Sequence, residues 1–518
     1  MFAMTPDPPE ESVGRDGFAQ QLGAEFTNFR IVRSRVITLF ATGVVFVLLS
    51  FVSALQGHGG NNVVPTGPDG EAVTDTYTFV HQPLAGNGTL TARVATFSGA
   101  YAPLSNTQLG GSQLQSGLAP WAKAGIILEP DTNPGTDYAA VMVTGAHGVR
   151  MQYNYTNDRP GIGGPVETSS PRWLRLTRVG DVVTGYDSTD GDHWTEIGTA
   201  RLTGLPRTIQ IGLFVTSPVY FPAESNSGTP SVATAAFDHF SAQGDFPYGS
   251  WTGDTIAGLY PTLPSDPTWQ QQSADFTISG SGDIAPLVGA TVFSIWSGAS
   301  IVNGTIVGLL MIIVLAALFT TSEYRRKSIR ATSAATARRV LAAKFVVVGS
   351  LAFVVGATAT AIAEPITRHV LVANGVYLFP QGALAVARII VGTGLFFGLA
   401  AVSVVALGSM LRRTAMTVVA GVVLLEAPGV LATVLPASES WLMRFTPTAA
   451  FAIQASLPKS NLVTSAYTIV NGYFPISPWG GLVVLAAYTA IILGAAMWLL
   501  RRGTPSSSPL PQFGQFEQ

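Results

Sequence analysis

The sequence contains no cysteine and unusually little charge. Without cysteine the chain forms no disulfide, no thiolate metal site and no cysteine nucleophile. Charged residues make up 11% of the chain and hydrophobic residues 47%, whereas an average soluble protein is roughly 25% charged. A composition so poor in charge is typical of a membrane protein.

The few charges are unevenly distributed along the chain. Residues 57–290 hold 9 of the 28 basic residues and 20 of the 30 acidic residues. The remainder is therefore net positive, although the chain as a whole has a formal charge of −2. Such a separation indicates two regions that face different surroundings.

Six stretches are long and apolar enough to be transmembrane helices, which need about 20 residues each. They are residues 36–55, 296–319, 345–363, 384–410, 415–435 and 479–500. The first could be a secretory signal peptide, but its apolar run is too long and 35 residues precede it. We therefore expect a retained transmembrane helix over residues 36–56.

Basic residues predict how these helices are oriented, because cytoplasmic loops are enriched in Lys and Arg. Four clusters fall on one side if six helices alternate: Arg30, Arg33 and Arg35; Arg325 to Lys344; Arg412 and Arg413; Arg501 and Arg502. The chain is then a multi-pass protein of the cell membrane, with both termini cytoplasmic. Residues 1–35 form the cytoplasmic N-terminus, 57–290 an extracytoplasmic domain, 291–502 a five-helix region with a cytoplasmic loop at 320–344, and 503–518 a cytoplasmic tail.

The extracytoplasmic domain reads as all-β over about residues 75–244. Short alternating runs such as 138–143, 149–155 and 173–178 are separated by Gly, Pro, Asn and Asp. Many short strands at this spacing predict a β-sandwich. Residues 246–286 are rich in Pro, Gly, Ser and Asp, and we expect them to form an irregular stalk.

Four segments of this domain, in order, resemble the concanavalin-A-like and laminin-G-like jelly-roll domains. They are WAKAGIIL (121–128), YAAVMVTGAHGVRMQY (138–153), WLRLTRVGDVVTGYDSTDGDHWTEIG (173–198) and IQIGLFVTS (209–217). The resemblance implies a jelly-roll sandwich inserted between the first and second transmembrane helices. Because a fold does not determine an activity, it leaves open whether the sandwich binds a substrate, a glycan or a partner protein.

Two features of the domain have both a functional and a structural interpretation. Trp121, Trp173 and Trp194 could stack on sugar rings, although aromatic residues in a sandwich more often belong to its core. Asp187, Asp190 and Asp192 in DSTDGD could bind Ca²⁺, but they lack the complete calcium-loop pattern, and Asp190-Gly191 is typical of a tight β-turn. We expect the turn, and no metal site.

The remainder of the chain resembles the membrane-spanning permeases of type-2 ABC exporters. The similarity lies in LGAEFTNFRIVRSRVITLFA (22–41) before the first span and in TTSEYRRKSIRATSAATARRVLAAKF (320–345) between the second and third. Phe18, Leu22, Phe26 and Phe29 recur at steps of three and four, which predicts an amphipathic helix at the cytoplasmic interface.

This resemblance implies that the loop after the second span is a coupling helix that docks into an ATP-binding subunit. The coupling residues would be Glu323, Tyr324, Arg325, Ile329, Arg330 and Thr332, while Arg338, Arg339 and Lys344 would set topology or contact lipid. The chain has no Gly-x-x-x-x-Gly-Lys-Ser/Thr loop, so it is not expected to be an enzyme, and it needs no cofactor of its own. ATP and Mg²⁺ would bind a separate cytoplasmic subunit, and the permease would pair with a second copy or a paralogue.

Ionisable residues within the spans are costly and therefore informative. Glu426 lies near the middle of the fifth span beside Pro428, as either a translocation-path carboxylate or part of a kinked helix. Glu364, Arg368 and Arg388 lie near span ends, and we expect them to be solvated. No feature predicts a nucleic-acid partner.

The leading interpretation is the permease subunit of an ATP-driven exporter with an extracytoplasmic binding domain. The alternative is an adhesion or sensor protein in which the sandwich binds carbohydrate and the helices only anchor it. Five clustered spans and a coupling-like loop exceed what an anchor requires.

The charge pattern generates a topology prediction. A reporter enzyme that is active only outside the cytoplasm should be active when fused after Gly57 or Leu263, and silent after Ala335 or Arg502. Activity after Ala335 would contradict the six-span arrangement.

Overall fold

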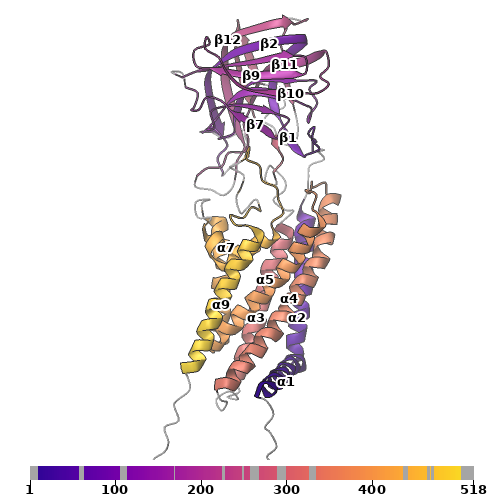
Figure 1. The fold of residues 1–518 in the computed structure, drawn as a ribbon, viewed down its shortest axis with the longest axis vertical. Coiled ribbons are helices and arrows are strands. Elements are labelled where there is room, and N and C mark those ends of the chain that lie inside the picture. The colour runs from indigo at the N-terminus through magenta and orange to yellow at the C-terminus, as the bar shows by residue number, and fades with distance from the viewer. Residues whose placement is uncertain are drawn as a thin grey trace, which may run out of the picture.

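The computed structural model describes residues 10–57, 64–104, 114–167, 170–223, 228–247, 250–256, 268–288, 299–325, 334–435, 441–463, 467 and 472–502. Within these ranges, the side chains of residues 10–16, 299–300, 323–325, 334–337, 433–434 and 500–502 are not described. The chain forms a β domain stacked on one end of a helix bundle (Figure 1). We call that end of the bundle proximal and the opposite end, where α1 lies, distal.

Among the described residues, six helical segments are long and apolar enough to cross a membrane, as the sequence predicts. They are α2 (Arg33–Gln56), α3 (Ala299–Arg325), α4 (Ala334–Ala373), α5 (Ala383–Leu411), the pair α6 (Thr414–Leu425) and α7 (Ala427–Val434), and α9 (Pro478–Arg502). Helix α1 (Glu10–Ile31) precedes them at the distal end, and Val32 in an extended conformation separates it from α2. In chain order the β domain lies between α2 and α3.

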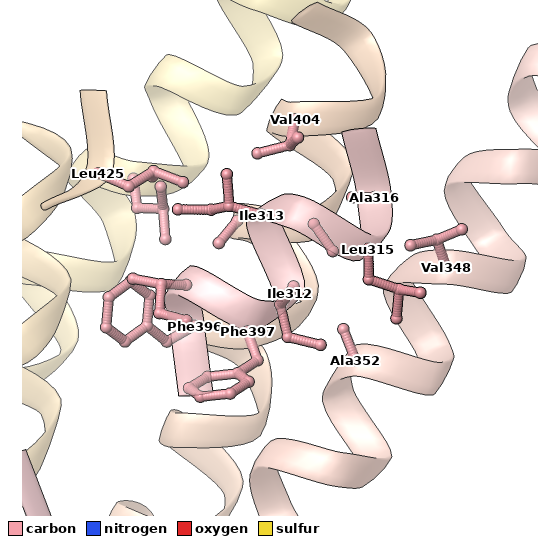
Figure 2. Close-up of a cluster of buried hydrophobic side chains, with 14 of the residues drawn as sticks. Ile312, Ile313, Leu315, Ala316, Val348, Ala352, Phe396, Phe397, Val404 and Leu425 are labelled. Atoms are coloured by element: carbon pink, nitrogen blue, oxygen red, sulfur yellow. The ribbon is translucent and has the colours of Figure 1, made fainter. Parts of the chain in front are cut away.

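Small residues allow the helices to approach closely, as is usual in membrane bundles. A methyl group on Gly304 of α3 would lie 2.2 Å from the Ser50 Oγ atom of α2, and one on Gly398 of α5 would lie 3.1 Å from the Gly349 carbonyl of α4. Between these contacts, Ile312, Phe397 and their neighbours from α3, α4, α5 and α6 form the buried core of the bundle (Figure 2).

The β domain consists of two facing layers. Its strands are β1 (Val73–Asp75), β2 (Tyr77–Tyr101), β3 (Gln115–Ser116), β4 (Lys123–Glu129), β5 (Ala139–Thr144), β6 (Val149–Tyr153), β7 (Asn157–Pro160), β8 (Arg172–Val179), β9 (Val182–Ser188), β10 (Thr195–Arg201), β11 (Thr208–Thr216), β12 (Ser231–Asp245), β13 (Thr252–Ile256), β14 (Thr268–Gln272), β15 (Asp275–Gly280) and β16 (Ile284–Pro286). All except β1 and β16, which pair with each other, belong to one fourteen-stranded sheet.

Strand β2 joins the two layers because it is 25 residues long. Its first part pairs with β11 and β13, and its later part pairs with β8 and β12. Gly86, at a φ of +76° that disfavours a side chain, lies where the partners change. The domain core lies between the layers. There, Val141 and Met151 of the first layer lie opposite Gly185 of the second layer.

The expected stalk at residues 246–286 is wrong. This segment contributes β13, which extends the first layer, and β14 and β15, which extend the second. Phe276 and Ile278 of β15 are buried in the main core. The alternation of Phe276 and Ile278 with polar residues is a strand signal.

A buried polar cluster attaches β1 and β16 to the outer face of the first layer. The Lys123 Nζ atom donates to Asp283 Oδ1 at 2.8 Å, and both side chains are at most 1% exposed. Asp75 Oδ2 accepts hydrogen bonds from the Gly135 amide and the Tyr155 hydroxyl, each at 2.8 Å. Since β1 and β16 carry the chain to and from the bundle, these contacts anchor both connections.

Apolar contacts join the domain to the bundle. Ala285 and Val288, at the end of the β domain, are buried in one cluster with Val463 and Tyr473 from the connection before α9. The two parts therefore share a small core in addition to their covalent links.

Burial of Asp75 predicts a pH dependence of domain stability. Desolvation raises the pKa of this carboxyl to about 7, so the folded domain favours its protonated form. This contribution to the stability of the folded domain is complete below the ordinary carboxyl pKa. It is lost as the pH rises through the pKa that Asp75 has in the folded state. For a fragment of residues 64–288, which buries its own core, the melting temperature should fall between about pH 4 and pH 7.

Asp75→Asn should make this fall shallower, while Asp192→Asn, at an exposed position, should leave it unchanged. Thermal unfolding followed by circular dichroism measures both. Equal pH slopes for the wild type and the Asp75 variant, or a fragment dominated by helix, would contradict the assignment.

Candidate functional site

The two stretches that resemble the permease family meet in a buried ion pair at the distal end of the bundle. Glu25 of α1 lies 3.4 Å from the Lys344 Nζ atom of α4, measured from Oε2. Glu25 is 6% exposed and Lys344 2%. Lys344 is therefore not a lipid contact, because its ammonium group lies inside the protein. Its influence on topology stays a prediction.

Aromatic and polar contacts surround this ion pair. The Phe319 ring of α3 lies 4.7 Å from the Lys344 ammonium and 4.8 Å from the Arg35 guanidinium, and the centroids of the Phe29 and Phe319 rings are 5.6 Å apart. Arg35 also donates to Ser322 Oγ at 2.9 Å. As a result, α1, α2, α3 and α4 are held together beside the α3–α4 connection.

Of the predicted amphipathic face of α1, Phe29 is buried and Leu22 packs against the bundle core, while Phe26 is 42% exposed. The helix therefore uses half of its apolar face for packing on the bundle. An exposed Phe26 at the distal end is compatible with the interfacial position that the sequence suggests.

The predicted coupling residues lie at and beyond the end of α3. Glu323, Tyr324 and Arg325 form its last turn, and only their backbone is described. Ile329, Arg330 and Thr332 lie outside the described residues. Among the predicted topology residues, Arg339 is exposed near the start of α4 and Arg338 is half-buried. The basic residues that begin α2 and α4, follow α5 and end α9 all lie at the distal end (Figure 1).

The connection between α7 and α9 enters the bundle again from its proximal end. Residues 442–457, here called the re-entrant segment, contain α8 (Leu442–Phe445) and the 3₁₀ helix η4 (Pro447–Gln454). Gln454 Nε2 donates to Thr305 Oγ1 of α3 at 2.7 Å and to Thr393 Oγ1 of α5 at 3.1 Å. Thr393 is ten residues into α5, so the segment reaches roughly 15 Å into the bundle.

Glu426 divides the fifth span into α6 and α7. Its backbone departs from helical geometry, with φ −122° and ψ −41°, and Pro428, the second residue of α7, has no amide donor. This confirms the kinked helix. The Glu426 Oε1 atom is buried and accepts no hydrogen bond within the described structure. That atom therefore does not form a hydrogen bond to a neighbouring span.

Glu364 is not the solvated charge that the sequence suggests, whereas Arg368 and Arg388 are half-buried. Glu364 is 9% exposed, Arg368 Nη2 donates to the Phe379 carbonyl, and Arg388 Nη2 donates to the Ala455 carbonyl of the re-entrant segment. These residues line two adjoining cavities of about 40 and 540 Å³ at the proximal end.

The three candidate ligand-stacking tryptophans are engaged in packing. Trp121 is 4% exposed and stacks on His147 with ring centroids 4.0 Å apart. The Arg175 guanidinium covers the ring of Trp194 at 3.7 Å, and Trp173 packs against Gly191 and His239. Trp121 is therefore a core residue, as the structural interpretation predicts. Trp173 and Trp194 pack on the surface of β8 to β10.

The DSTDGD sequence forms the expected turn. Gly191 has a φ of +84°, and Asp190 Oδ1 accepts hydrogen bonds from the Asp192 and His193 amides. Hydrogen bonds from His193 hold the pKa of the Asp190 carboxyl below its usual range. Within the described part of the chain, no group of His, Asp and Glu side chains is arranged to hold a metal ion.

Sequence reasoning missed the Glu25–Lys344 pair and the re-entrant segment. For the ion pair, each residue belongs to a motif that the sequence shows, but nothing in a single sequence indicates that the two motifs meet. For the second, the apolar run from Phe445 to Ile453 is too short to span a bilayer, and a run of that length between two spans indicates a re-entrant segment.

The buried ion pair predicts an asymmetric mutational response. Lys344→Met removes the cationic partner of a buried carboxylate and should cost about 3–5 kcal/mol, whereas Glu25→Met combined with Lys344→Met should recover most of the loss. Arg339→Met, at an exposed position five residues away, should change stability by less than about 0.5 kcal/mol. Thermal unfolding in detergent measures these effects. Equal losses for Lys344→Met and Arg339→Met would contradict the buried position.

Comparisons with known proteins provide only weak structural likenesses. The sequence matches no protein-family model and no curated protein. Among solved structures, a protein of unknown function from Saccharomyces cerevisiae is similar at 16% identity and a TM-score of 0.23, over 37% of this chain and 85% of that one. A scytalido-glutamic peptidase bound to a transition-state analogue is similar at 9% identity and a TM-score of 0.25, over 42% of this chain and all of that one. At these scores neither likeness carries an argument about function.

Proposed function

We propose that the chain is the membrane-spanning subunit of a type-2 ABC exporter. The supporting observation is the buried Glu25–Lys344 pair, which brings together the two segments that resemble this family. The pair lies beside the α3–α4 connection, where the family places its coupling helix. A conformational change of that connection would therefore be transmitted to α1 and α4 together.

The proposal includes a membrane orientation. The distal end, with its basic clusters, would face the cytoplasm under the positive-inside rule. Both chain ends would then be cytoplasmic, and the β domain would lie outside as a concanavalin-A-like sandwich. Its acidic composition does not oppose this placement, because acidic residues have little influence on topology.

The re-entrant segment supports transport rather than simple anchoring. Irregular backbone at membrane depth is tolerated only where protein buries it or where it lines an aqueous path. The segment is buried among α3, α5 and α9, and its Gln454 reaches polar groups on two of these helices. An anchor for a binding domain needs no such element.

ATP hydrolysis would take place in a separate cytoplasmic subunit, and two permease chains would form the translocation path. The β domain would bind the substrate, a glycan or a partner protein at the exit. Glu426, whose Oε1 atom is buried without a hydrogen bond, is the proposed carboxylate of the path.

Docking predicts a selective loss of coupling. The chain would be co-expressed with the ATP-binding subunits encoded by the same source, and complexes would be purified through the permease. Glu323→Ala with Tyr324→Ala should reduce recovery of the ATPase and complex-dependent hydrolysis by about tenfold or more, because truncating a docked charge costs roughly 2–5 kcal/mol.

The matched control is Arg413→Ala, which removes an exposed charge at the same end of the bundle but in the α5–α6 connection. It should leave ATPase recovery unchanged. If no ATP-binding subunit co-purifies with the wild type, the exporter proposal fails. If the control and the double variant behave alike, the coupling role of the α3–α4 connection fails.

A further inference from the structure

The larger proximal cavity is enclosed by three elements that are distant in the sequence. It has a volume of about 540 Å³ and lies between the start of α5, the end of the re-entrant segment and the start of α9. Gln381, Gly382 and Arg388 line it from the α5 side, Lys459 from beyond the re-entrant segment, and Ser477 and Pro478 from the α9 side.

The cavity is strongly electropositive. Arg388 and Lys459 both line it, and no carboxylate is among the described residues that do so. The smaller adjoining cavity, which shares Gln381, adds one carboxylate, Glu364, and one guanidinium, Arg368. The two cavities together therefore hold three cations and one anion.

Existing contacts orient these cations without satisfying them completely. Arg388 uses Nη2 to donate to the Ala455 carbonyl, whereas its Nε–H is buried and has no hydrogen-bond acceptor within the described structure. The Lys459 ammonium lies 5.6 Å from the Tyr467 ring and 6.0 Å from the Tyr473 ring. Cation–π contacts of this kind hold the ammonium group in place while leaving its N–H donors available.

Two helix N-termini open onto the same space. Helix α5, of 29 residues, begins directly after Gly382, which provides no side-chain cap. Helix α9, of 25 residues, begins at Pro478, which has no amide N–H, and its Gly480 amide donates to the Ser477 Oγ atom at 3.3 Å. The first amides of a helix lack intrahelical acceptors and carry a partial positive charge, so they favour an anion. The uncapped end of α5, beside an arginine and a lysine, provides donors from several directions, whereas Ser477 already caps the end of α9.

Apolar side chains at the rim indicate the source of the anion. Leu384, next to Gly382, is 88% exposed, and Trp479, next to Pro478, is 51% exposed. Val391 on α5 and Val483 on α9 continue these exposed faces toward the middle of the bundle. In a membrane these faces contact acyl chains, and a tryptophan at a span end marks the headgroup level.

We propose that this cavity binds the phosphate of an anionic phospholipid, whose acyl chains lie along the exposed faces of α5 and α9. Arg388 and Lys459 contact the phosphate together with the amides that begin α5. Because the bound lipid also touches the re-entrant segment, it fixes the position of that segment relative to α5. The inference does not depend on the exporter proposal, since no ATPase is involved.

Binding can be measured on the full-length chain alone in detergent. Short-chain phosphatidylglycerol is titrated, with short-chain phosphatidylcholine and inorganic phosphate as comparisons, and binding is followed by native mass spectrometry and thermal shift. Phosphatidylglycerol should bind and stabilise the wild type. Arg388→Gln with Lys459→Gln should weaken this binding by about tenfold or more, which corresponds to at least one charge-assisted contact.

The control variant is Arg444→Gln, an exposed basic residue of α8 that does not line the cavity. It should bind like the wild type. Because Arg388 is partly buried and its substitution could impair folding, Lys459→Gln alone provides a second test at an exposed position, and it should also weaken binding. Equal binding of phosphatidylcholine, or equal affinity of all variants, would overturn the proposal. If inorganic phosphate binds tightly and phosphatidylglycerol binds no more tightly, the cavity binds a free anion. The proposal that the anion is a lipid phosphate is then overturned.

Discussion

The rest of the structure depends on the inability of hydrocarbon to hydrogen-bond a polypeptide backbone. Within a bilayer each amide and carbonyl must find its partner inside the protein, which permits helices and excludes exposed irregular chain. The six long helices follow directly from this constraint. Among the described residues, the 3₁₀ helix η4 is an irregular feature whose residues are all buried, and at the break in the fifth span the Oε1 atom of Glu426 is buried. The β domain, whose sheet has exposed edges, lies beyond one end of the bundle.

Charge organises the two ends of the bundle differently. At the distal end, basic residues gather near the surface, and one of them, Lys344, is drawn into the interior by Glu25. At the proximal end, three cations and Glu364 line cavities between the helices and the re-entrant segment. Buried charge requires specific partners, so each of these places constrains how neighbouring elements can move. The proposed coupling contact and the proposed lipid site use these two ends.

The β domain is attached through buried polar contacts as well as through the chain. Lys123 holds Asp283 and the carbonyl of Ile284, so the strand that leads to α3 is fixed to the domain. Ala285 and Val288 then pack against Val463 and Tyr473 of the connection before α9. Movement of the β domain would therefore pull on the region beside the larger cavity and on the start of α3. This gives a physical route by which binding outside could influence the bundle.

The sequence by itself determined the number and approximate extent of the membrane helices, because apolar length is a local property that hydrocarbon thickness selects. It also determined that the inserted domain is built of strands, since alternation and turn residues are local too. The tertiary structure alone decided that β13, β14 and β15 complete the two layers, because short strands are recognised by the partners they find. It alone decided that Glu25 meets Lys344 and that Arg388 meets the carbonyl of Ala455, since these pairs are separated by hundreds or tens of residues. Such contacts depend on how whole helices pack, and helix packing is set by the summed fit of many small side chains that no short segment specifies.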